Sequence, residues 1–132
     1  MDDHSLLAWL AFNRIAGLGP VSQRALLQQA GGMPALLAQP ALLEQAPVVR
    51  EQAALWFAFC EGRNDSTLLQ QAQRDAELAH QHGASIVPAG DDNYPLLLAQ
   101  VHDAPTVLYV RGSTASLHLP QLALVGSRNA SA

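Results

Sequence analysis

The order of apolar and polar residues divides the chain into a helical part and a mixed part. Residues 5–16 are apolar almost all round a helical period, which predicts a helix covered on more than one side. After this segment, glycines and prolines recur at intervals that predict the starts and ends of short helices. We expect these helices at about residues 20–30, 34–38, 40–45 and 47–61, and another from a cap at Asp65 or Ser66 to Gly83.

A strand pattern replaces the helical pattern after Gly83. Because the composition also changes near residues 62–66, we expect a helical domain over residues 1–62 and a second domain over residues 63–132. The predicted fold class is α+β. Short apolar runs predict strands at residues 85–87, 106–110 and 122–125, with a short helix at residues 94–100 between the first two.

Charge and cysteine content narrow the class of protein. The net charge is −4 and all seven basic residues are arginines, so any attraction to nucleic acid must be local. The single Cys60 allows no disulfide within the chain and fits a reducing compartment. The acidic start is unlike a signal peptide, and the apolar runs are too short for a membrane span. We therefore expect a cytoplasmic protein without a membrane partner.

Residues 17–20, Gly-Leu-Gly-Pro, join the first two predicted helices. Such a turn resembles a helix-hairpin-helix element, in which N–H groups of the second helix face a DNA phosphate. The alternative, a plain turn within a helical bundle, is favoured because the proline removes one donor and only Arg14 and Arg24 lie nearby. We expect a positive φ at Gly17 or Gly19, and no more than a weak phosphate contact at these glycines.

The other chemically reactive residues of the sequence are not spaced for catalysis or metal binding. The histidines are scattered, and Cys60 ends an apolar run, which favours a buried and unreactive thiol. The carboxylates of Asp91 and Asp92 suggest acid–base chemistry, but Asp92 or Asn93 stands where the N-cap of helix 94–100 belongs. We interpret this segment as structural, and we expect no catalytic residue, metal or cofactor.

The strand expected at residues 122–125 runs directly into Gly126, Ser127 and Arg128. Backbone N–H groups at the end of a strand, with a guanidinium beside them, suit a phosphate. An ordinary turn with a solvated arginine explains the same residues equally well, because the motif is short. Gly126, Ser127 and Arg128 are nevertheless the strongest candidate site in the sequence.

Three segments in the order found here resemble the DNA-processing protein A family (DprA, also called Smf). They are residues 92–98 (DNYPLLL), 104–112 (APTVLYVRG) and 124–128 (LVGSR). The glycine hairpin also stands where this family carries a small helical domain, so the resemblance spans essentially the whole chain, most tightly from residue 91.

The resemblance implies an extended Rossmann-like domain behind a small helical domain of the helix-hairpin-helix or SAM-like type. Members of this family bind single-stranded DNA during natural transformation and help to load the RecA recombinase on it. The implied partners are therefore single-stranded DNA and RecA, with no enzyme activity. Gly126, Ser127 and Arg128 match the family's Gly-Ser-Arg loop, which contacts the DNA backbone.

Family members continue well past the position of Ala132, with a second glycine-rich motif, further basic residues and a dimer interface. The chain thus resembles an N-terminal part with a truncated Rossmann-like domain, and we expect weak DNA binding and a homodimer only through the missing region. Two other functions stay open. One is a Rossmann-like nucleotide or phosphoribosyl hydrolase that begins with the Gly-Ser-Arg loop. The other is a helical interaction module that docks a partner through the apolar surface of Leu6–Ile15.

Overall fold

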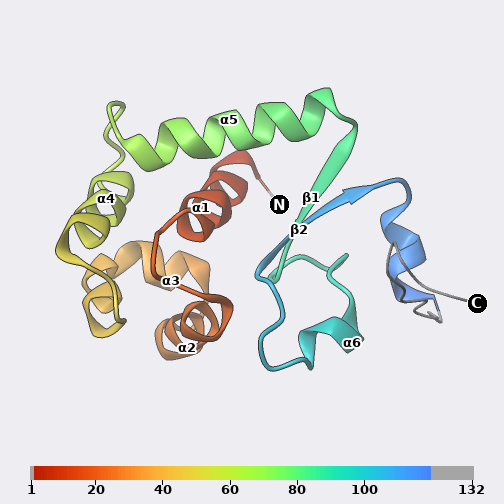
Figure 1. Ribbon diagram of the computed structural model, residues 1–132, viewed down its shortest axis with the longest axis horizontal. Coiled ribbons are helices and arrows are strands. Elements are labelled where there is room, and N and C mark those ends of the chain that lie inside the picture. Colours follow the sequence, from red (N-terminus) through yellow and green to blue (C-terminus); the bar gives the residue numbers. More distant parts are fainter. Residues whose placement is uncertain (1, 120–132) are drawn as a thin grey trace, which may run out of the picture.

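The computed structural model of the protein describes residues 2–119. Helices dominate its first part, and a small sheet with short helices forms its second part (Figure 1), which confirms the expected α+β class. The helices of the first part are α1 (Asp3–Asn13), α2 (Pro20–Ala30), α3 (Met33–Ala38), the 3-10 helix η1 (Pro40–Gln45), α4 (Arg50–Cys60) and α5 (Thr67–Gln81). They are followed by β1 (Ala84–Pro88), α6 (Leu96–Ala99), β2 (Val107–Arg111) and the 3-10 helix η2 (Thr114–His118).

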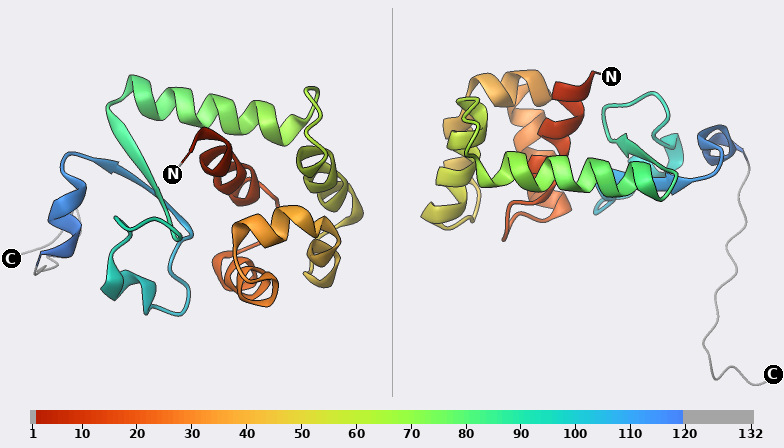
Figure 2. Two further views of the ribbon diagram at one scale, coloured as in Figure 1. Left: turned by 180° about the vertical axis from the view of Figure 1, so that it is seen from behind. Right: turned by 90° about the horizontal axis from the view of Figure 1, so that it is seen from above.

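Helix α1 is covered on several sides, as its apolar circumference predicts. Figure 1 and Figure 2 show α5 running across α1, and α1 also contacts α3, α4 and both strands. Residues 8–12 are all buried, and so is Ile15 beyond the end of the helix. The chain itself therefore covers most of the apolar surface of Leu6–Ile15, which gives no support to the alternative that this surface docks a partner.

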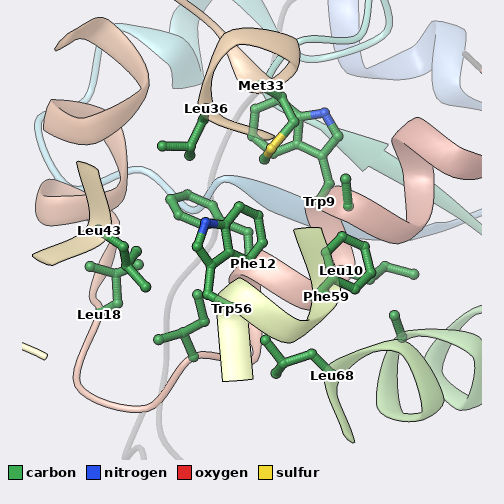
Figure 3. Close-up of a cluster of buried hydrophobic side chains, with 14 of the residues drawn as sticks. Trp9, Leu10, Phe12, Leu18, Met33, Leu36, Leu43, Trp56, Phe59 and Leu68 are labelled. Atoms are coloured by element: carbon green, nitrogen blue, oxygen red, sulfur yellow. The ribbon is translucent and has the colours of Figure 1, made fainter. Parts of the chain in front are cut away.

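Aromatic side chains form the middle of the core (Figure 3). The Trp56 indole from α4 lies between two phenyl rings, with ring centroids 5.4 Å from Phe12 and 5.6 Å from Phe59. Burying one such side chain contributes about 1.5–3 kcal/mol to stability. Leu68 from α5 and Val107 from β2 belong to the same cluster, so the helices and the sheet share one core.

Most helix boundaries follow local signals in the sequence. Pro20 occupies the first turn of α2, as expected, and Gly31 ends that helix with a φ of 96°. Ser66, rather than Asp65, caps α5 by accepting a hydrogen bond of 3.2 Å from the Leu69 N–H. A hydroxyl at this position satisfies one of the N–H groups that the first turn of a helix leaves unpaired.

The turn before α6 differs from the expectation. Helix α6 begins at Leu96, and its N-cap is Pro95 without a side-chain hydrogen bond, so the assignment of Asp92 or Asn93 as N-cap is wrong. Asp91 Oδ1 instead accepts a hydrogen bond of 2.8 Å from the Asn93 N–H. The physical reason is that proline disfavours helical backbone at the residue before it, so the helix starts after Pro95 and is shorter than expected.

The two described strands pair antiparallel, with Ile86 opposite Tyr109 and Pro88 opposite Val107. The first two expected strands are thus confirmed. The third, at residues 122–125, lies outside the described residues. The Rossmann-like continuation of the sheet therefore stays a prediction.

Helix α5 follows the expected domain boundary in sequence but packs against α1 in space. The division into residues 1–62 and 63–132 stays a prediction. Two domains divided there would be in contact through α1 and α5. Within residues 2–119, the helices are too short or too polar to cross a membrane.

Candidate nucleic-acid interface

The hairpin between α1 and α2 has the backbone conformation that its glycines predict. Gly17 has a φ of +83°, whereas Gly19, the N-cap of α2, has an ordinary φ of −82°. The expected positive φ is therefore confirmed at Gly17. A Cβ atom added at Gly17 would lie 3.7 Å from the Pro47 carbonyl oxygen, which is an ordinary contact. Backbone conformation rather than lack of space makes glycine the preferred residue there.

Two N–H groups beside the hairpin are used inside the protein. The Ala16 N–H donates a hydrogen bond of 3.0 Å to Gln52 Oε1 on α4. The Leu18 N–H donates to the Ile15 carbonyl at 3.4 Å. Fewer donors are thus left for a phosphate than a Gly-X-Gly hairpin can offer, which favours the interpretation as a plain turn.

Both arginines near the hairpin make contacts within the protein. Arg14 forms a two-pronged ion pair with Asp75 of α5, with Arg14 Nε 2.8 Å from Oδ2. This hydrogen bonding raises the pKa of the Arg14 guanidinium above its ordinary value. Arg24 donates from Nη1 to the Ala99 carbonyl at 3.0 Å, at the end of α6 where a helix leaves carbonyl groups unpaired. The contacts of both side chains therefore stabilise the fold.

A buried hydrogen bond joins the second part of the chain to α2, and another lies within the second part. The Thr106 hydroxyl donates to Gln23 Oε1 at 2.7 Å, and both residues are almost fully buried. The hydroxyl of the buried Tyr94 donates to the Pro105 carbonyl. Sequence reasoning missed the bond between Gln23 and Thr106, because these residues are 83 positions apart and neither carries a local signal that points to the other.

The C-terminal half of β2, which we call its outer end, presents two exposed side chains, Tyr109 and Arg111. From the sequence they were expected only as part of a strand. Tyr109 is 50% exposed, and Arg111 is exposed as well. Partial burial raises the pKa of the Tyr109 hydroxyl; the Asp75 charge adds to this rise, and the Arg14 charge opposes it. Alternation along the strand was the signal that could have found the pair, since residues two apart lie on one face.

The remaining candidates for reaction chemistry are poorly placed for it. Cys60 is partly buried at the end of α4, and burial, with a smaller effect of Glu61, raises the pKa of its thiol to about 12. This agrees with the expectation of an unreactive thiol. In the described part of the chain, no three His, Cys, Asp or Glu side chains gather as a metal site would require.

Gly126, Ser127 and Arg128 lie outside the described residues, but a comparison with protein families reaches them. Residues 85–132 match the family described as DNA recombination-mediator protein A. The expected resemblance is confirmed over this segment. The match includes β2 and the Gly-Ser-Arg residues, and it fits a role of this DprA/Smf-like segment in DNA processing and recombination. No curated protein matches the chain.

The match begins within β1, so it does not include the glycine hairpin. A phosphate contact at Gly17 or Gly19 stays a prediction.

Proposed function

We propose that the protein binds single-stranded DNA in natural transformation and assists the loading of RecA recombinase on that strand. The observation that carries the proposal is the match of residues 85–132 to the recombination-mediator family. The role is one of binding rather than catalysis, takes place in the cytoplasm and needs no cofactor. Homodimer formation belongs to the same proposal.

The proposed contact with DNA is made by Gly126, Ser127 and Arg128. Backbone N–H groups at the end of a strand bind phosphate oxygens, and a guanidinium can add two parallel hydrogen bonds. Contacts to phosphates position a protein on nucleic acid and carry no sequence information. Binding through this loop is therefore independent of base sequence.

The glycine hairpin contributes little to this proposed binding. Two of its N–H groups are occupied, and Arg14 and Arg24 make contacts within the fold. Any contact of a phosphate with Gly17 or Gly19 is weak, because Arg14 and Arg24 are already engaged within the fold.

Fluorescence anisotropy with labelled oligonucleotides tests the proposal. Arg128→Ala should weaken binding to oligo-dT and to a mixed-sequence strand by a similar factor, about fivefold or more, because it removes a charged phosphate contact. Arg50→Ala is the matched control, since it removes an exposed arginine at the start of α4. Equal affinities of the wild type and Arg128→Ala would contradict the proposed site.

A further inference from the structure

The outer end of β2 combines an exposed aromatic ring with an exposed cation. The register places Tyr109 opposite Ile86 and Arg111 opposite Ala84, and residues paired in this way share one face of a sheet. The next pair on this face, Pro88 and Val107, is buried, so the inner end of this face is covered. Tyr109 and Arg111 lie at the outer end, where the face is open.

The Tyr109 side chain borders a groove between β2 and the later turns of α5. The groove holds about 270 Å³, which is below the range of about 300–1,000 Å³ typical of sites for drug-sized ligands. Leu78 and Ala79 of α5 form an apolar wall of the groove. His82, the C-cap of α5, also lines the groove. Leu78 is 46% exposed. The size and the lining of the groove fit one planar ring lying on Tyr109.

Charges at the groove favour an anion next to such a ring. Asp75 lines the groove, but its side chain is 11% exposed and is paired with Arg14. The Arg14 side chain remains 45% exposed. Within residues 2–119, Arg111 takes part in neither of the ion pairs. The sum of these three charges is positive, although the whole chain carries −4.

We propose that Tyr109 and Arg111 form a contact for one nucleotide of single-stranded DNA. A base stacks on the Tyr109 ring, and a neighbouring phosphate pairs with the Arg111 guanidinium. Aromatic side chains combined with cations bind single strands in this manner, and stacking tolerates any base. The two residues are about 7 Å apart along the strand, so both can reach one nucleotide.

This inference rests on the proposed function and adds a second point of contact to the one at Gly126, Ser127 and Arg128. The two contacts differ in kind. The loop is expected to hold a phosphate alone, whereas the face of β2 also takes up a base.

Tyrosine NMR tests this inference directly, because the chain contains two tyrosines. Tyr94 is 4% exposed and serves as an internal reference, whereas Tyr109 is 50% exposed. With isotope-labelled tyrosine rings, a short oligo-dA should move the ring protons of Tyr109 upfield through the ring current of the stacked base. The signals of Tyr94 should stay in place.

Substitutions separate stacking from charge. Tyr109→Leu removes the ring and should weaken binding about fivefold or more, whereas Tyr109→Phe keeps the ring and should bind as the wild type does. Arg111→Gln should weaken binding several-fold. The control Arg50→Gln removes an exposed arginine on α4 and should have no effect.

Two results would overturn the inference. They differ in whether the proposed function is also contradicted. If Arg128→Ala weakens binding while the Tyr109 signals stay in place at saturating oligonucleotide, the contact on β2 is wrong and the proposed DNA binding stands. If millimolar oligonucleotide leaves the tyrosine signals unchanged, and millimolar protein leaves the anisotropy of the labelled oligonucleotide unchanged, the proposed function fails together with the inference.

Discussion

Single residues of the helical part are constrained by backbone conformation and by burial. Gly17 has a φ of +83°, in the left-handed region that side chains disfavour, while Gly19 close by has an ordinary φ of −82°. Cys60 carries a thiol whose ionisation is opposed by burial. Each of these constraints can be tested by a change at one position.

Replacing Gly17 with alanine should destabilise the protein by about 1 kcal/mol or more, because alanine must adopt a disfavoured φ. Gly19→Ser is the matched control. Gly19 is the N-cap of α2, has extended backbone and has open space around it. Serine there can cap the helix, so stability should hold or rise. Urea denaturation of both variants measures the difference, and equal stability of Gly17→Ala and the wild type would contradict the account.

Cys60 should react slowly with a thiol reagent at pH 8. Burial raises the pKa of the thiol to about 12, and only the thiolate attacks such reagents. We expect the native protein to react at least about tenfold more slowly than the same protein unfolded in urea, where the thiol has its ordinary pKa. Similar rates in the two states would show that the thiol is accessible and ionised in the fold.

At the scale of the elements, hydrogen bonds from helix α2 link the two parts of the chain. Its Gln23 binds Thr106 just before β2, and its Arg24 binds the carbonyl at the end of α6. The Arg24 Nε atom is buried without a hydrogen-bond partner among the described residues. The family-matched segment is therefore anchored to the second helix of the glycine hairpin.

Gln23→Leu should destabilise the protein by about 1–3 kcal/mol, because the buried Thr106 hydroxyl loses its acceptor. Thr106→Val should have a similar effect, since it leaves the Gln23 oxygen unpaired. The double variant removes both polar groups, so its loss of stability should be smaller than the sum of the losses in the two single variants. Urea denaturation of the four proteins gives the coupling energy, and strictly additive losses would mean that the bond contributes nothing.

The elements themselves were largely predictable, and the contacts between them were not. Local signals placed α2, α3, η1 and α5 within a few residues, because proline, glycine and a serine cap act on neighbouring backbone. The N-cap assigned to Asp92 or Asn93 is wrong because Pro95 disfavours helical backbone at the residue before it. The bond between Gln23 and Thr106 depends on how α2 meets the sheet, which periodicity does not encode.

At the scale of the whole molecule, charge limits how strongly DNA can bind. The chain carries a net charge of −4 with seven arginines. Arg14 pairs with Asp75, Arg63 pairs with Asp65, and Arg24 binds a carbonyl. Since four arginines are left in a chain of negative net charge, affinity depends on a small number of local contacts.

The 132-residue chain should therefore bind a single-stranded oligonucleotide weakly, with a Kd of roughly 0.1 mM or poorer at physiological salt. Anisotropy titration of labelled oligo-dT measures this value. A sub-micromolar Kd would mean that the helical part contributes far more to binding than its paired arginines suggest.

The central claim, a phosphate contact at Arg128, is tested most directly by the salt dependence of binding. The logarithm of the binding constant for oligo-dT is measured against the logarithm of the salt concentration, for the wild type and for Arg128→Ala, starting at low salt where binding is tightest. Loss of one phosphate contact should flatten the slope by about one unit. An unchanged slope would contradict the claim, because it would show that the arginine displaces no counterions from DNA.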